Sequence, residues 1–386
     1  MLIELILAIL IARLMAFILD RFEIPAITAY IVTGIILGPS VLNLISGGMP
    51  EDLVTLTFFF LLFYTGLNVD FKGIREYLGK SLVITCGGVG LTIFLAVALL
   101  STYMKLELLP ALVIAIAISN TATEIVVVML EHSYEVSDEF RRILVMSSFI
   151  DDILAILFMS LLRGAILGEI ADVSYELLRL MGFFIVSVTV IALVTKYVPR
   201  LIYPLVVNWD YLLFLSSVIF FGMVYAAHVL GISEIFGAYI AGLIIGMLRL
   251  VHDPTVMYTV RVEEFVLRMS TVLEFFIIPI FFVYIGYNTL VSQLLSPLSL
   301  IILGIAFAGK FIGVAVTSAP WSRPAQSITL GLAMNVRGSI EPAVALVALE
   351  RGIITQDLFS AVVAVSLFTS TVIPVIFNLI TRLRRI

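Results

Sequence analysis

Charged side chains are scarce in this sequence. Their scarcity indicates whether water or lipid surrounds the folded chain. Asp, Glu, Lys and Arg make up 13% of the 386 residues, whereas ordinary soluble domains average about 25%. Hydrophobic residues make up 62%, and the mean hydropathy is +1.19. These values exclude an ordinary soluble protein. They indicate an all-α polytopic membrane protein, because helices satisfy their own backbone hydrogen bonds in lipid.

Residue types and motifs that mark other function classes are also missing. The single cysteine, Cys86, excludes an internal disulfide, and the three histidines do not cluster into a metal site. No phosphate-cradling glycine loop, nucleophile elbow or nucleic-acid patch is present. We therefore expect no enzyme activity, no cofactor and no nucleic-acid partner, and we expect the lipid bilayer to surround the chain.

Apolar runs of about 20 residues, each long enough to cross a bilayer, recur along the whole chain. We predict thirteen membrane-spanning helices between the polar breaks. They cover residues 2–19, 26–46, 53–69, 81–103, 109–130, 142–165, 177–203, 211–231, 234–250, 268–290, 296–319, 326–349 and 357–381. The first run lacks a basic region and a cleavage site, so we expect it to be a retained helix. No polar stretch is long enough for a soluble domain, so residues 1–386 are expected to form a single membrane domain.

The basic residues predict the orientation of these helices. Most of the 22 Lys and Arg residues lie in loops on the side of the C-terminus. The loops on the opposite side contain only Lys105, Arg163, Arg179 and Arg351. The positive-inside rule then puts the N-terminus outside and the C-terminus in the cytoplasm, in the cell (plasma) membrane.

Short stretches of the sequence repeat in a regular order. GIILG at Gly34–Gly38 matches GLIIG at Gly242–Gly246, and Tyr64-Thr65-Gly66-Leu67-Asn68 matches Tyr284-Ile285-Gly286-Tyr287-Asn288. We predict a first repeat over 1–165, a linker helix over 166–209 and a second repeat over 210–386. Six helices on each side of one linker helix give the two halves opposite orientations, as in the inverted repeats of secondary transporters.

Two adjacent carboxylates, Asp151 and Asp152, lie within the sixth apolar run. They follow Arg141 and Arg142 by about ten residues, or about 15 Å of helix, which is near the middle of a bilayer. Ionised carboxylates at that depth are costly and mark ion pathways or proton relays. We predict that Asp151 and Asp152 bind a monovalent cation and exchange it for a proton.

Two polar runs predict breaks in the fifth and twelfth helices. The first contains Ser119, Asn120 and Thr121 at mid-span, and the second covers 335–339. Interrupted helices in transporters expose backbone groups near the midplane, where they contact the transported ion. The alternative is that the hydroxyl groups bond back into their own helices.

The remaining ionisable residues inside the helices suggest partners for these groups. Lys310 is the natural salt-bridge partner for one aspartate, with a purely structural counter-ion as the alternative. Arg337 and Glu341 are four residues apart and suggest a structural pair that holds the broken helices. Glu124 is another candidate partner for Arg337, so we assign these three residues a structural or gating role.

At these residues the chain resembles the second family of monovalent cation:proton antiporters. That family includes bacterial and archaeal sodium/proton antiporters and the membrane part of potassium-efflux antiporters. The resemblance covers almost the whole chain and rests on PAITAYIVTGIILGP, FYTGL, the Ser119–Thr123 run, the aspartate pair, GAYIAGLIIG and PIFFVYIG.

The resemblance implies thirteen helices in an inverted repeat, with crossed discontinuous helices. It also implies a homodimer in which a core domain moves against a dimer domain, as in an elevator. Asp152 would be the central carboxylate, Asp151 would pair with Lys310, and Thr121 would lie at the crossing. The aspartate pair resembles the electrogenic branch, whereas the Arg-Gly sequence at Arg337 is similar to an electroneutral family. The stoichiometry is therefore open.

We predict a secondary active antiporter that exchanges protons for Na⁺ and serves pH homeostasis, with Li⁺ and K⁺ as further candidate substrates. A sodium-coupled symporter of organic anions on the same fold is the alternative, and Arg337 is its only support. A channel or receptor-like subunit is a third class, which the buried aspartate pair does not favour.

Overall fold

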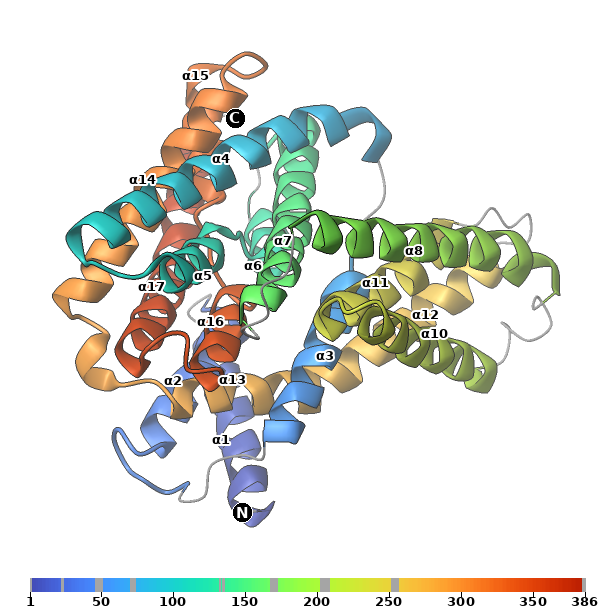
Figure 1. The fold of residues 1–386 in the computed structure, drawn as a ribbon, viewed down its shortest axis with the longest axis horizontal. Helices are drawn as coiled ribbons and strands as arrows, with labels where there is room; N and C mark the ends of the chain where they lie inside the picture. The colour runs from blue at the N-terminus through green and yellow to red at the C-terminus, as the bar shows by residue number, and fades with distance from the viewer. Residues whose placement is uncertain are drawn as a thin grey trace. The chain divides into compact units, whose positions relative to one another are not determined.

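The computed structural model describes residues 2–21, 24–45, 51–69, 74–131, 133, 136–166, 173–201, 209–250 and 257–383 (Figure 1). These residues form helices joined by short connections. The chain divides into two compact units, each built from segments far apart in the sequence. The first unit covers Met1–Met49, Gly73–Phe158 and Phe282–Ile386, and the second covers Pro50–Lys72 and Met159–Phe281.

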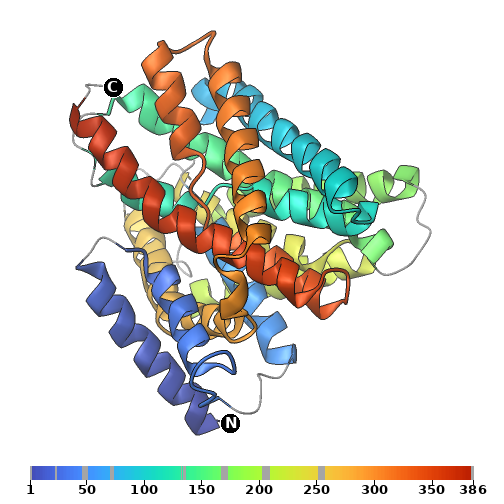
Figure 2. The ribbon, with the colours of Figure 1, turned by 90° about the vertical axis from the view of Figure 1, so that its left-hand side faces the viewer.

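Most helices belong to the first unit. They are α1 (Leu2–Asp20), α2 (Ala26–Leu37), α4 (Ile74–Tyr103), α5 (Leu108–Ser119), α6 (Thr123–Glu131), most of α7 (Asp138–Ile166), the end of α13 (Ile278–Tyr287), η3 (Val291–Gln293), α14 (Pro297–Ser318), α15 (Pro324–Ala333), α16 (Ile340–Glu350) and α17 (Gln356–Leu383). Figure 2 shows α17, in red, running along this unit, where it packs against α14, α15 and α16.

The second unit contains the remaining helices. They are α3 (Glu51–Leu67), the end of α7, α8 (Val173–Leu201), α10 (Trp209–Val229), α11 (Glu234–Met247), η1 (Leu248–Leu250), α12 (Met257–Val272), η2 (Leu273–Ile277) and the start of α13. The segment η2 is a π-helical turn. It ends two residues before Pro279, whose ring removes one backbone donor from the helix.

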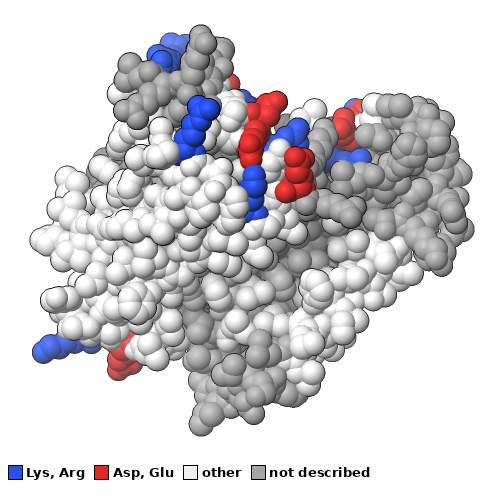
Figure 3. Space-filling view, turned by 90° about the horizontal axis from the view of Figure 1, so that it is seen from above, with Lys and Arg blue, Asp and Glu red and all other residues white. Residues whose placement is uncertain are grey.

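Each predicted apolar run corresponds to a helix or to consecutive helical pieces. Seven helical stretches of the described residues are long and apolar enough to cross a membrane, and shorter apolar helices accompany them. The face drawn in Figure 3 carries Lys, Arg, Asp and Glu in a few small groups, with wide stretches of other residues between them. The all-helical membrane fold is therefore confirmed, whereas thirteen crossings stay a prediction.

Glycines let α4 and α14 approach closely, and this contact sets the position of Lys310 on α14. A Cβ atom added to Gly313 would lie 2.4 Å from the carbonyl oxygen of Gly87, and one added to Gly309 would lie 2.7 Å from the Cα atom of Thr92. A Cβ at Gly88 would lie 3.2 Å from the Cδ atom of Lys310. The aliphatic part of Lys310 therefore packs against α4, and its ammonium group extends beyond this contact.

The repeated glycines form two matching close contacts, one in each unit. In the first unit, a Cβ on Gly34 of α2 would lie 2.1 Å from the carbonyl oxygen of Val283 on α13. In the second unit, a Cβ on Gly242 of α11 would lie 2.2 Å from the carbonyl oxygen of Phe63 on α3. Only glycine permits such an approach between helix backbones.

Candidate functional site

The two polar runs are the breaks in two interrupted helices of the first unit. The segment between α5 and α6 covers 120–122, and the segment between α15 and α16 covers 334–339. The breaks bond to each other: the backbone N–H of Ala122 donates to the carbonyl of Val336 over 2.9 Å, and the Thr121 hydroxyl donates to the carbonyl of Met334 over 2.8 Å. The broken ends of four half-helices therefore meet at one place, with backbone groups that their own helices leave unpaired.

The carbonyl ends of α5 and α15 are occupied by two buried cations. The Lys310 ammonium donates to the carbonyl of Ser119 over 2.7 Å. The Arg337 guanidinium donates to the carbonyl of Ile118 over 3.0 Å and 2.6 Å, and to the carbonyl of Asn335 over 3.0 Å. Cations are favourable at helix C-termini, because the exposed carbonyls carry partial negative charge. These residues stabilise the crossing through its backbone.

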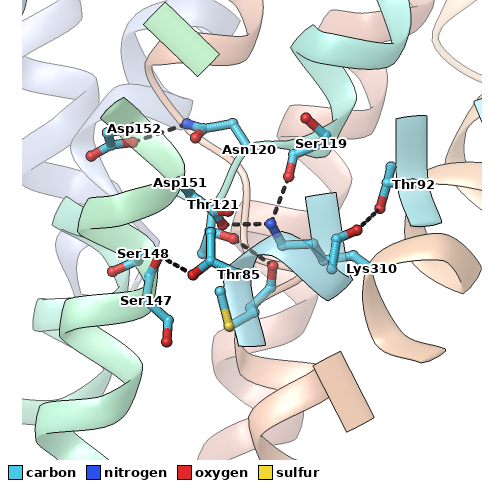
Figure 4. A network of polar contacts seen from close by, with 12 residues as sticks. Thr85, Thr92, Ser119, Asn120, Thr121, Ser147, Ser148, Asp151, Asp152 and Lys310 are labelled. Atoms are coloured by element: carbon cyan, nitrogen blue, oxygen red, sulfur yellow. Dashed lines mark hydrogen bonds and ion pairs between the residues drawn. The ribbon is translucent and has the colours of Figure 1, made fainter. Parts of the chain in front are cut away.

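Asp151 and Lys310 form an ion pair within the first unit (Figure 4). Lys310 Nζ lies 2.5 Å from Asp151 Oδ2, and both side chains are fully buried. The residue Ser147, one turn before Asp151 on α7, is held by Thr85 of α4, whose hydroxyl donates to the Ser147 carbonyl over 3.0 Å. The structure thus joins the lysine to the first aspartate of the pair.

Asp152, the second aspartate, has a different environment. It is 1% exposed, and its carboxylate accepts hydrogen bonds from Asn120 Nδ2 over 3.0 Å and from the Thr123 hydroxyl over 2.8 Å. Among the described residues, no Lys, Arg or His forms an ion pair with it. Two neutral donors stabilise a carboxylate less than a paired cation does, so the carboxylate retains capacity for a proton or a metal cation.

Two further buried oxygens lie on the residues that form this centre. Asn120 Oδ1 and Asp151 Oδ1 have no hydrogen-bond partner among the described residues. Buried polar atoms are usually satisfied, so these two oxygens can accept a further partner such as a water molecule or a cation. With the Asp152 carboxylate they provide oxygen atoms of the type that hard cations prefer.

The other predicted residues of the polar run contact different groups. The Ser119 hydroxyl donates to the carbonyl of Ile116 in its own helix over 2.9 Å, and the Thr121 hydroxyl bonds across the breaks. Of Ser119, Asn120 and Thr121, only Asn120 bonds to Asp152 through its side chain. Thr123, which we did not single out as a ligand, also reaches it. Its place in the same polar run, three residues after Asn120, is the signal that would have found it.

Arg337 does not form the ion pair that its spacing from Glu341 suggested. Its five hydrogen bonds to described residues go to the carbonyls of Ile118, Ala306 and Asn335 and to the Asn335 side chain. The residue lies in the break rather than on one helical face with Glu341, so the i,i+4 geometry is absent. Glu341 accepts instead from the N–H of Gly338 over 2.9 Å, and Glu124 accepts from the N–H of Ser339 over 3.2 Å.

The fold and this buried ionic centre define a helical membrane transporter. A family model described as the transmembrane part of sodium/hydrogen exchangers matches residues 6–383, so the chain belongs to the sodium/hydrogen exchanger family. Members of this family are secondary transporters rather than enzymes, and the chain is a cation/proton antiporter.

Individual relatives agree with this assignment. The probable Na⁺/H⁺ antiporter 3 of Methanocaldococcus jannaschii is 28% identical over 376 residues, covering 93% of this chain and 91% of that protein. The probable Na⁺/H⁺ antiporter GerT of Bacillus cereus is 24% identical over 366 residues, covering 93% and 94%. The solved structure of the sodium proton antiporter MjNhaP1 of M. jannaschii at pH 8 has the same fold, with a TM-score of 0.73, 17% identity, and coverage of 98% of this chain and 97% of that one.

These findings do not support the alternative of an organic-anion symporter. That alternative depended on Arg337, whose side chain is fully buried. Its guanidinium donors all bond to the backbone carbonyls or the asparagine side chain at the crossing. It therefore presents no free donor to a carboxylated solute.

Proposed function

We propose that this chain exchanges Na⁺ for protons and that Asp152 is the carboxylate that binds them in turn. The observation that carries the proposal is the contrast within the aspartate pair. Asp151 is neutralised by Lys310 at 2.5 Å, whereas Asp152 is equally buried and bonds only to neutral donors. A buried carboxylate without a counter-charge needs a proton or a cation. Binding one in place of the other couples the two fluxes.

The remaining residues have supporting roles in this proposal. Asn120 and Thr123 orient the Asp152 carboxylate, and Asp151 and Asn120 offer further oxygens to a monovalent cation. Thr121 and Arg337 join the two breaks, and Ser119 supplies the carbonyl that receives Lys310. Na⁺ is supported as the substrate by the similarity to sodium/proton antiporters, and Li⁺ and K⁺ are further candidates.

We extend the proposal to the architecture of the working transporter. The matching glycine contacts support an inverted repeat, because each joins a glycine of the first half to one of the second half: Gly34 meets Gly286, and Gly66 meets Gly242. The proposed repeats cover 1–165 and 210–386, with 166–209 as the linker. The resemblance to cation:proton antiporters supports a homodimer that works as an elevator. The distribution of basic loops supports a cytoplasmic C-terminus in the plasma membrane.

Transport by the purified protein in proteoliposomes tests this function. Vesicles with an acidic lumen and a pH-sensitive dye should lose their pH gradient when Na⁺ is added outside. The same assay with K⁺ and Li⁺ gives the cation preference, and clamping the membrane potential gives the electrogenicity. Sodium-independent proton flux, or sodium-driven uptake of a carboxylated solute without proton movement, would contradict the proposal.

A further inference from the structure

Two glutamates outside the proposed ion site lie at the start of the two half-helices that leave the crossing. Glu124 is in the first turn of α6, and Glu341 is in the first turn of α16. Glu124 Oε1 accepts from the backbone N–H of Ser339 over 3.2 Å, and Glu341 Oε2 accepts from the backbone N–H of Gly338 over 2.9 Å. The two carboxylates therefore bind adjacent peptide groups of one chain segment.

Gly338 permits this close arrangement. A Cβ atom at Gly338 would lie 2.9 Å from Glu124 Oε1, closer than a carbon and a carboxylate oxygen tolerate. The carbonyl of Gly338 accepts from the Ser366 hydroxyl of α17 over 3.1 Å, which fixes the orientation of this peptide. The structure thus places a carboxylate of the first half of the chain and one of the second half at neighbouring peptide groups.

One carboxylate oxygen in this pair has no donor. Glu341 is 1% exposed, and its Oε1 atom has no hydrogen-bond partner among the described residues. Glu124 is partly exposed. Adjacent carboxylates in a site of low polarity do not both ionise, and a shared proton satisfies the orphaned oxygen while removing the repulsion.

The charged groups near the pair include more carboxylates than cations. The ionisable side chains near it are Arg337 from the break, Asp151 and Asp152 from α7, and Lys310 from α14. Lys310 is paired with Asp151, and the donors of Arg337 are directed to carbonyls and to Asn335. Four carboxylates at the crossing therefore face two cations, so one proton at Asp152 alone leaves a negative charge without compensation.

We propose that Glu124 and Glu341 form a second proton-binding site, in which one proton lies between the two carboxylates. The O–H group of the protonated carboxylic acid donates to an oxygen of the other carboxylate, so no other reactant is required. Its presence holds the start of α16 against the start of α6. Its release at alkaline pH adds a negative charge beside Asp152, which strengthens the attraction of Asp152 for a cation. Only this last consequence rests on the proposed function.

Infrared spectroscopy of the purified protein tests the site directly. The measurement uses the Asp152→Asn background at neutral pH, where exposed carboxyl groups are ionised and Asp152 contributes no proton. We expect a carbonyl-stretch band of a protonated carboxylic acid that moves in D₂O and disappears when Glu341→Gln is added. Glu107→Gln, at an exposed position before α5, is the matched control and should leave the band unchanged.

Each outcome decides the proposal. Absence of the band in the Asp152→Asn protein, or its persistence after Glu341→Gln, would overturn it. If the Glu341→Gln protein does not fold, Glu124→Gln provides the test. Loss of the neighbouring carboxylate should shift the band to higher frequency, and an unshifted band would contradict a shared proton. Retained transport by Asp152→Asn would contradict the proposed function but would not affect the infrared band. Failure of the proposed function and failure of the proposed glutamate site are therefore distinguishable.

Discussion

Lys310 Nζ lies 2.5 Å from Asp151 Oδ2 in a fully buried ion pair, and this contact separates the functions of two adjacent aspartates. One is compensated within the protein, and the other is left with neutral donors. Successive residues on a helix point about 100° apart, so neighbours in the sequence reach different partners. The following predictions test this division and the packing that produces it.

Removing the lysine should destabilise the fold, since it leaves a buried charge without a partner. For Lys310→Gln we expect a loss of about 3–5 kcal/mol in the free energy of unfolding. The double variant Asp151→Asn with Lys310→Gln should recover much of that loss, because both charges are then absent. Thermal unfolding of the wild type, the two single variants and the double variant in detergent completes this double-mutant cycle. Additive losses in the double variant would show that the two side chains do not interact.

Removing the Thr123 hydroxyl should weaken the cation site while preserving the fold. Thr123→Val keeps the side-chain shape but deletes the donor that lies 2.8 Å from Asp152. A hydrogen bond to a charged group contributes about 1.5–3 kcal/mol, so we expect at least a tenfold change in the apparent affinity for Na⁺. The control is Thr271→Val, whose exposed hydroxyl bonds only to the carbonyl of Leu267 in its own helix. Equal affinities in the two variants would argue against a role for Thr123.

Arginine should be required at position 337. Its planar group has five N–H donors and satisfies the carbonyls of three residues at once, which the single ammonium of a lysine does not reproduce. Arg337→Lys should therefore lower the thermal unfolding temperature, whereas Arg351→Lys at an exposed position should leave it unchanged. Wild-type stability in Arg337→Lys would contradict the proposed link between the two breaks.

Adding a methyl group at Gly34 should disrupt the contact of α2 with α13. The new Cβ would lie 2.1 Å from the carbonyl oxygen of Val283, so the helices must separate and lose packing. Gly304→Ala provides the contrast, because nothing lies within 4 Å of the corresponding Cβ. That variant should gain about 0.5–1 kcal/mol from helix propensity. Unfolding midpoints for both variants check the prediction, and equal stability would contradict it.

Much of the fold and of the ionic centre is predictable from the sequence. The apolar runs predicted the helices, and the polar residues around Asn120 and Asn335 predicted the two breaks. Those residue types suit neither lipid nor a continuous helix interior. The sequence also made Asp151, Asp152 and Lys310 recognisable. Ionised groups in the middle of a membrane-spanning segment are energetically costly and therefore usually mark a functional site.

The partners at the crossing were less predictable, because they depend on backbone directions that side-chain types do not specify. Arg337 bonds to carbonyls released by the end of α5, and the position of those carbonyls follows from where α5 stops. Glu124 accepts from the N–H of Ser339, a group more than 200 residues away in the sequence. The hydroxyls of Ser119 and Thr121 looked equivalent to that of Thr123, and only the course of the unwound segment distinguishes them.

Sodium/proton exchange by Asp152→Asn in proteoliposomes is the most direct test of the central claim. The substitution keeps the size of the side chain and removes the group that binds the proton and the cation in turn. We predict that the addition of Na⁺ no longer dissipates an imposed pH gradient, although the protein unfolds at a temperature close to that of the wild type. Exchange at the wild-type rate in this variant would contradict the assignment of Asp152 as the carrier carboxylate.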